Sequence, residues 1–146
     1  MENIDQILDA PQGETIKLQY AGFWIRFGAY FIDAIILGMV GFVFGLAMAE
    51  VASEAIGSII NLVIGVSYFA VMESSGYQAT LGKMAVGIKV GDQNGDPIGV
   101  LNAIGRYFAK IISGLLLGIG FMMIGWDEKN QGIHDKLAST YVFYSK

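Results

Sequence analysis

The hydrophobic pattern of the chain is dominated by two long apolar stretches separated by a short polar link. The first covers residues 27–49, about 34 Å as a helix, and the second covers residues 55–72, about 27 Å. Each length is close to that of a bilayer's hydrocarbon core, roughly 30 Å. The link is very short and holds Glu50, Ser53 and Glu54. The pattern therefore predicts two antiparallel transmembrane helices.

A third apolar stretch, residues 111–126, carries no charge but would form only about 24 Å of helix. Arg106 and Lys110 precede it with helical spacing, and their long side chains can extend to a membrane surface. We therefore expect residues 101–110 to lie along the interface. Two arrangements remain open for the stretch that follows. It either crosses the membrane or is broken and re-enters, turning back at residues 118–120, "GIG".

Two polar segments have an alternating pattern instead. Residues 86–90 place Val86, Ile88 and Val90 on one face, and the Asn94-Gly95 pair that follows is a strong hairpin-turn signal. Pro97 would confine a returning strand to a sheet edge. Residues 139–144 also alternate, with β-branched and aromatic side chains. These segments are either loops or strands that pair into a small sheet at the membrane surface.

The predicted fold is thus an all-α integral membrane protein. It has two antiparallel transmembrane helices, a third hydrophobic segment that is either complete or broken and re-entrant, and a small surface β-hairpin or sheet. We expect a polar N-terminal tail, residues 1–22, followed by one membrane domain, residues 23–146. Acidic residues outnumber basic ones in the tail, the reverse of a cleaved signal peptide. Residues 73–100 form the loop between the second and third segments.

Composition strengthens the membrane prediction and excludes several functions. The chain is 54% hydrophobic and 15% charged, with 20 glycines and no cysteine. Disulfides and thiolate chemistry are therefore absent. A net charge of −4 gives no support to nucleic-acid binding. The sequence shows no metal-ligand spacing, phosphate-binding loop or hydrolase motif. We expect no enzyme activity, no cofactor and no metal.

Basic residues predict the orientation. Lys17 and Arg26 precede or begin the first helix, and Lys83 and Lys89 follow the second, whereas the link between the helices has no base. The positive-inside rule then places the N-terminus and residues 73–100 in the cytoplasm, with the protein in the cell membrane. Three full crossings would put the C-terminus outside. Pairing of residues 139–144 with residues 86–90 requires it inside, and we favour the inside position.

Asp33 is the main candidate for chemistry because it lies about 15 Å along the first helix from Phe23, near mid-membrane. Insertion of an aspartate there costs roughly 2.5–3.5 kcal/mol, and such residues usually mark an ion or proton pathway. Arg26 shares its helix face but is about 10 Å away along the axis. A bridging water or another base is the more plausible partner, and the candidate bases are Arg106, Lys110 and His134. In the structural alternative, Asp33 is protonated or tied to Asn61 or Ser67 and fastens helices together.

Small residues and the single histidine supply further candidates. Close helix packing is expected at Gly41, Gly45, Gly57, Gly65, Gly114 and Gly118, and a homo-oligomeric interface is the sharper interpretation of the same pattern. His134 precedes Asp135 near a membrane surface, where a histidine could relay protons. The simpler interpretation is that Asp135 caps or pairs locally, beside Lys136.

Four short segments, in order, resemble the RDD family of small membrane proteins. They are "GFWIRFGAYFIDAIIL", "TLGKMAVGIKV", "NGDPI" and "QGIHDKLASTYVF", and the likeness covers about residues 20–144. The family is named for an arginine at the start of its first helix and two aspartates. Arg26 and Asp33 match directly, and Asp135 is assigned as the second aspartate. The resemblance implies a polytopic protein for which transport is the common suggestion. If the three residues form one site, Asp135 should approach Arg26 at the cytoplasmic surface.

Two functions remain open. In the first, the protein assists transport of ions or small solutes, with Asp33 exchanging a proton or monovalent cation and an Arg26–Asp135 pair at the cytoplasmic mouth. Two or three helices scarcely enclose a pathway, so this function requires a homo-oligomer or a larger membrane partner. In the second, the protein is a non-catalytic membrane scaffold whose charged residues fix helix packing and partner binding.

Overall fold

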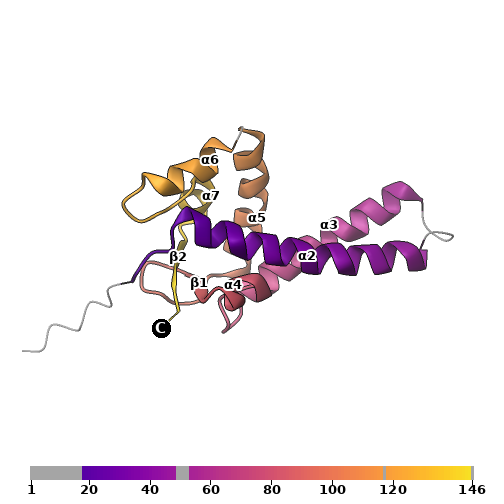
Figure 1. Cartoon of the computed structure of the whole chain (residues 1–146), viewed down its shortest axis with the longest axis horizontal. Helices are drawn as coiled ribbons and strands as arrows, with labels where there is room; N and C mark the ends of the chain where they lie inside the picture. The colour runs from indigo at the N-terminus through magenta and orange to yellow at the C-terminus, as the bar shows by residue number, and fades with distance from the viewer. Residues whose placement is uncertain (1–17, 49–52, 117, 146) are drawn as a thin grey trace, which may run out of the picture.

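The computed structural model describes residues 18–48, 53–116 and 118–145. Its longest part is a hairpin of two helices, α2 (Phe23–Met48) and α3 (Glu54–Ser74) (Figure 1). The predicted N-terminal tail is described only from residue 18. The link residues 49–52 lie outside the described residues. The two helices predicted to cross the membrane are therefore present, and both are long and apolar enough to do so.

The hairpin exposes its apolar side chains instead of burying them. The best windows of α2 and α3 have mean hydropathies of 2.3 and 2.0. Large apolar side chains that are exposed along α2 and α3 include Phe31, Ile35, Met39, Phe42, Val43, Leu46, Ile56, Ile59, Leu62 and Val63. Helices that are hydrophobic on all sides belong in a core or a bilayer, and the exposure of these two helices fits a bilayer.

The third apolar stretch is divided between two helical pieces. The long helix α5 (Val100–Leu115) is followed by α6 (Ile119–Met122) and the 3₁₀ turn η1 (Met123–Gly125). The two pieces are bent by 112°, so a third span exists only if the bent pair is counted as one. Gly118 begins α6 with φ 75°, a conformation that glycine adopts without steric cost. In Figure 1, α5 runs across the direction of the hairpin, and it packs against α3 at one end of it.

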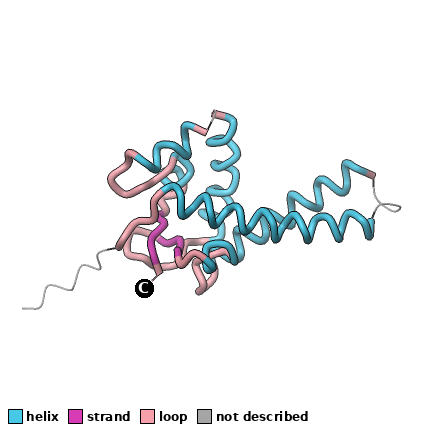
Figure 2. The backbone as a smooth tube through the Cα atoms, in the orientation of Figure 1, coloured by secondary structure: helices cyan, strands magenta, loops and turns pink. Residues whose placement is uncertain are grey.

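Two short strands form the small sheet expected at the end of the hairpin. β1 (Ile88–Gly91) pairs antiparallel with β2 (Tyr141–Tyr144), with Ile88 opposite Tyr144. The expected pairing of residues 86–90 with residues 139–144 is therefore present. Tyr20 forms an isolated bridge to Phe143. The start of α2, the loop after α3 and the C-terminal strand thus meet at one end of the hairpin, as Figure 2 shows.

The prediction that the chain returns as a strand at Pro97 was wrong for the described residues. Gly95 has φ 88° and the backbone N–H of Asp96 donates to Asp92 Oδ1 at 3.0 Å, so the turn is present. However, the other edge of β1 is already occupied, because the backbone N–H of Val90 donates to the carbonyl of Gln78 at 2.7 Å. Among the residues that the structure describes, β2 alone pairs with β1 as a strand.

The same end of the molecule contains the short helices that shape the site. α4 (Leu81–Ala85) packs against α2, and α7 (Ile133–Leu137) packs against α5. The apolar core between these elements consists of small and β-branched side chains, including Ala21, Ala29, Ile88, Val90, Ala103 and Val142. The described part of the protein is therefore a packed head on an exposed apolar hairpin.

Candidate functional site

Arg26 and Asp135 form a buried ion pair between the start of α2 and helix α7. Arg26 Nη1 donates to Asp135 Oδ2 at 2.5 Å. The same guanidinium donates from Nε to the carbonyl of Ala21 at 3.0 Å and from Nη2 to the carbonyl of Asn130 at 2.6 Å. A guanidinium offers five donors in a fixed plane, so one side chain can tie several segments together. The structure thus brings these two predicted residues into contact.

Arg106 links this pair to a second carboxylate. Arg106 Nη2 on α5 lies 2.8 Å from Asp135 Oδ1, and Arg106 Nη1 lies 3.5 Å from Glu73 Oε2 on α3. Asp135 also accepts the backbone N–H of Gly132 at 3.1 Å, which caps the start of α7. Arg106 therefore connects a carboxylate from the middle of the sequence with one from near its C-terminal end.

Glu73 is the centre of a further group of bases. It forms ion pairs with Lys83 on α4 and, at 3.5 Å, with Lys110 on α5. Sequence reasoning singled out Lys110 as an accessory residue but missed Glu73 and Lys83 as site residues. The available signal for Glu73 is a carboxylate directly after the second apolar stretch. Lys83 lies inside "TLGKMAVGIKV", the segment that carried the family resemblance.

Positive charge exceeds negative charge in this buried group. We define the charge cluster as Arg26, Glu73, Lys83, Arg106, Lys110 and Asp135. All six side chains are 10% exposed or less. At the formal charges of the free side chains, four bases and two acids leave an excess of two positive charges (4 − 2). Since isolated buried charges are costly, the excess favours either a counter-charge from outside the group or a neutral lysine.

Two groups of the cluster, on α4 and α7, and the neighbouring His134 have shifted pKa values. Burial would raise the pKa of Asp135, but Arg106 and Arg26 hold it well below its usual range. Burial lowers the pKa of Lys83, and Glu73 opposes that shift. Burial, reinforced by Arg106 and Lys110, lowers the pKa of His134 to about 3.

His134 is therefore neutral near pH 7, when Asp135 is ionised. Its Nε2 lies 3.5 Å from Asp135 Oδ1, and its ring packs on Phe121. A proton relay near neutral pH finds no support in this environment. The imidazole adds no charge to the four bases of the cluster.

A cavity of about 470 Å³ opens beside the cluster. Four of the six cluster residues line it, namely Arg26, Lys83, Arg106 and Lys110, together with Tyr30, His134 and a set of apolar side chains that includes Phe23, Phe27, Phe121, Met122 and Ile124. The Tyr30 hydroxyl and Arg106 Nε are buried and have no hydrogen-bond partner among the described residues. Lys110 Nζ lies 4.9 Å from the centre of the Tyr30 ring. The cavity combines unused donors with positive charge.

Asp33 lies outside this cluster and has its own set of donors. Tyr68 of α3 donates its hydroxyl to Oδ1 at 2.7 Å, and Thr80 donates to Oδ2 at 2.6 Å. The backbone N–H of Gly82 donates to Oδ1 at 2.8 Å. A Cβ on Gly82 would lie 2.1 Å from the carbonyl oxygen of Ala29, so only glycine allows α4 this close to α2. Asp33 therefore fastens α2 to α3 and to the start of α4.

The partners expected for Asp33 were wrong. Within the described residues it forms no ion pair, because Arg106 and Lys110 pair with Glu73 or Asp135 and His134 faces Asp135. Ser67 is exposed. Asn61 lies against Gly41 instead, 3.2 Å from the position of an added Cβ. The tyrosine, threonine and backbone donors were not anticipated.

The glycines named from the sequence differ in their surroundings. Gly41 faces Asn61 across the hairpin, and Gly65 faces the hydroxyl of Tyr107 on α5, so both lie at close contacts within the chain. Gly118 serves the turn into α6. Nothing lies within 4 Å of a Cβ added at Gly45, Gly57 or Gly114, as far as the structure describes the chain. Oligomeric packing at those three positions stays a prediction. The described residues also contain no group of three potential metal ligands.

Comparisons with known proteins match the sequence of this chain to relatives of similar length. Residues 20–139 match the RDD family. Uncharacterized protein YxaI of Bacillus subtilis (strain 168) is 37% identical over 147 residues, covering 85% of this chain and 97% of the relative. Uncharacterized membrane protein YteJ of the same organism is 27% identical over 157 residues, covering 97% and 92%. No solved structure shows significant similarity to the chain. The chain is a membrane protein that belongs to the RDD family.

Proposed function

We propose that this RDD family protein assists the movement of a small anionic solute at the membrane, with the charge cluster as its solute-binding site. The observation that carries the proposal is the excess of two positive charges beside a cavity of about 470 Å³. A ligand cavity is typically about 300–1,000 Å³, with apolar walls and a few convergent polar groups. This cavity has both properties.

The charge balance favours an anion over the monovalent cation or proton suggested by Asp33 alone. A cation entering the cavity would meet Arg26, Lys83, Arg106 and Lys110. An anion would offset the excess charge and accept from Arg106 Nε and the Tyr30 hydroxyl. Asp33 is already satisfied by three donors, so its role in this proposal is to position α4 and hence Lys83.

The site would face the cytoplasm. Residues 18–22, the loop after α3 and the C-terminal strand meet at one end of the hairpin, and that end holds the basic residues that the structure describes. Bases concentrate on the cytoplasmic side of bacterial and eukaryotic membrane proteins alike. The protein would then lie in the cell membrane with both termini inside.

Transport through one chain would need more helices than the described residues supply. Two candidate spans, or three if the bent pair counts, do not enclose a pathway. The exposed apolar faces of α2 and α3 are available for a second copy or a larger membrane partner. We therefore place the function in a homo-oligomer or a heteromeric membrane assembly.

Uptake by proteoliposomes tests this function. Purified protein would be reconstituted, and uptake of hexyl phosphate, inorganic phosphate and Rb⁺ would be measured with and without protein. We expect protein-dependent uptake of at least one of the two anions and none of Rb⁺. Lys110→Gln should reduce that uptake, because it removes one base that lines the cavity. Lys129→Gln, whose lysine contacts the Tyr141 ring elsewhere, is the matched control and should not reduce it.

A non-catalytic scaffold remains the second candidate, and one observation favours it. Arg26 ties the N-terminal segment, the loop before α7 and α7 itself together, and Asp33 ties three helices. In that case the charged residues fix the head that a partner recognises. Wild-type protein that carries no solute in the uptake assay, in the presence of correct folding, would leave the scaffold function standing.

A further inference from the structure

We propose that the cavity beside the charge cluster binds the phosphate monoester headgroup of a membrane amphiphile, whose hydrocarbon chain leaves through the cavity mouth toward the bilayer. This inference names the solute class for the function proposed above and rests on it. It is carried by the contrast between the buried lining residues Arg26, Lys83, Arg106 and Lys110, which we call the floor of the cavity, and the exposed apolar lining residues Phe27 and Met122, which we call its mouth.

The floor matches a phosphate monoester in charge. Such a group carries about −1.5 to −2 at pH 7 and offers three acceptor oxygens. The charge cluster has an excess of two positive charges, and arginine is well suited to phosphate because of its planar set of donors. Arg106 is 1% exposed, lines the cavity and has a buried Nε with no acceptor among the described residues. A single carboxylate would offset only half of the excess.

The Tyr30 hydroxyl supplies a second, independent donor. It is buried and has no partner within the part of the chain that the structure describes. Lys83 Nζ and Lys110 Nζ lie 5.5 and 4.9 Å from the centre of its ring. Both ammonium groups thus lie near the ring of Tyr30, and its hydroxyl would donate to a phosphate oxygen that these bases attract.

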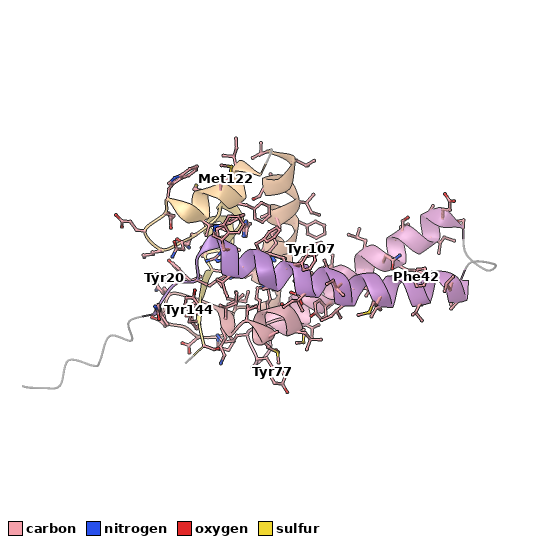
Figure 3. The ribbon with its side chains drawn as sticks, in the orientation of Figure 1. Tyr20, Phe42, Tyr77, Tyr107, Met122 and Tyr144 are labelled. Carbon is pink, nitrogen blue, oxygen red and sulfur yellow. The ribbon has the colours of Figure 1, made fainter. Side chains whose placement is uncertain are left out.

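The mouth of the cavity is apolar and therefore suits a hydrocarbon chain better than water. Phe27 and Met122 line the cavity and are 55% and 53% exposed, whereas the basic lining residues are buried. Phe27 belongs to the first candidate span, and Met122 belongs to α6 in the bent pair. Figure 3 labels Met122 on α6, away from the hairpin's far end, where Phe42 is labelled. A free hydrophilic anion would gain nothing from these side chains, but a hydrocarbon chain would bury them, at roughly 25 cal/mol per Å².

Three soluble probes separate headgroup from chain. Hexyl phosphate carries both, inorganic phosphate carries the headgroup alone, and hexyl glucoside carries the chain alone. Binding to the purified full chain in dodecyl maltoside would be measured by isothermal titration calorimetry. We expect hexyl phosphate to bind at least about tenfold more tightly than either comparison probe, since each part contributes more than about 1.4 kcal/mol.

Four variants test the basic floor and the apolar mouth of the cavity separately. Lys110→Gln should weaken hexyl phosphate binding by about tenfold, the loss expected for one charge-assisted contact. Met122→Gln should weaken hexyl phosphate but leave inorganic phosphate unchanged. Lys129→Gln and Met84→Gln are the matched controls, because neither residue lines the cavity, and both should bind like wild type.

Each outcome decides the inference. Equal binding of inorganic and hexyl phosphate would overturn it and leave a free anion as the solute of the proposed function. Equal binding of hexyl glucoside and hexyl phosphate would also overturn it, because the basic floor would then recognise nothing. Tight binding of hexyl phosphate without uptake by proteoliposomes would support the inference and contradict only the transport function.

Discussion

Arg26 Nη1 lies 2.5 Å from Asp135 Oδ2, although 109 residues separate the two in sequence. The contact joins the first turn of the first membrane helix to a short helix near the C-terminus. It also brings Arg106, on a third helix, to the same carboxylate. The head of the protein is therefore assembled around one aspartate that pairs with two arginines. Removing either side of this contact leaves buried charge behind.

Arg26→Ala should destabilise the protein strongly. It removes one partner of a buried ion pair, a change that typically costs about 3–5 kcal/mol, and it frees the carbonyls of Ala21 and Asn130. Arg26→Lys should be intermediate, because one ammonium cannot reach all three acceptors. Thermal melting in dodecyl maltoside checks both. A melting temperature for Arg26→Ala equal to that of wild type would contradict this account of the contact.

Asp33→Asn should lower stability without removing transport. The amide has one acceptor oxygen where the carboxylate has two, so the charge-assisted bond from the Thr80 hydroxyl is lost or that hydroxyl must accept from the NH₂ group instead. We expect a loss of about 1–3 kcal/mol. Uptake per folded protein should persist, because Asp33 forms no ion pair with the charge cluster among the described residues, and an asparagine of the same shape can still hold α4 and hence Lys83 in place. Loss of uptake in a folded Asp33→Asn protein would instead support exchange of a proton or a monovalent cation by Asp33.

Gly82→Ala should be one of the most damaging small substitutions in the chain. Its Cβ would lie 2.1 Å from the Ala29 carbonyl oxygen and 2.8 Å from Asp33 Cγ, so α4 would have to move away from α2. Gly105→Ala in α5 is the matched control. Nothing lies within 4 Å of its new Cβ, and alanine favours helix over glycine by about 1 kcal/mol. Comparison of the two melting temperatures checks the prediction, and equal effects would contradict the packing of α4.

Stability should fall with pH below about 6.5 because of His134. Its pKa is about 3 in the folded protein and about 6.5 in the unfolded chain, so only the unfolded chain binds a proton between these values. The free energy of unfolding is therefore highest above pH 6.5. It decreases toward pH 3, with a slope approaching about 1.4 kcal/mol per pH unit. The lowered pKa of Asp135 acts in the same direction at more acidic pH.

His134→Gln isolates this contribution. The variant has no imidazole to protonate in the unfolded chain, so its melting temperature should depend less on pH between 6.5 and 4.5. Thermal melting across that range, on wild type and variant in parallel, gives the two slopes. Equal slopes would show that His134 is already protonated in the folded protein, which contradicts its buried position beside Arg106.

Topology can be tested in the cysteine-free chain. We expect single cysteines at Lys89 and Ser145 to react with an impermeant reagent only after permeabilisation of cells, because β1 and β2 lie at the proposed cytoplasmic end. A cysteine at Ser53, beside the link between the helices, should react in intact cells. Reaction of Ser145 but not Lys89 in intact cells would contradict the pairing of the two strands.

Hydropathy and alternation predicted much of the fold because these signals are local. The two spans follow from periods within a few residues of one another, whereas the break in the third stretch and the two strands were each one of two alternatives that the pattern left open. The returning strand after Asn94-Gly95 was wrong for a non-local reason. The edge of β1 that it would need is occupied by Gln78, which no local pattern indicates.

The site was predicted only in part, for the same reason. The family resemblance pointed to Arg26 and Asp135, which the structure places in contact. Glu73 and Lys83 escaped notice because each alone has the pattern of an ordinary residue at a membrane boundary. The donors of Asp33 are a tyrosine hydroxyl, a threonine hydroxyl and a backbone N–H, and such partners carry no charge signal. Only the packing of α4 on α2 brings the last two to Asp33.

The central claim is that the charge cluster is an anion site, and ligand-dependent thermal stabilisation tests it most directly. A ligand that binds only the folded protein stabilises it by about 2.7 kcal/mol at a concentration of 100 Kd. Hexyl phosphate should raise the melting temperature of wild type and raise that of Lys110→Gln less, whereas RbCl at the same ionic strength should raise neither. Stabilisation by Rb⁺, or an equal effect of hexyl phosphate on both proteins, would contradict the claim.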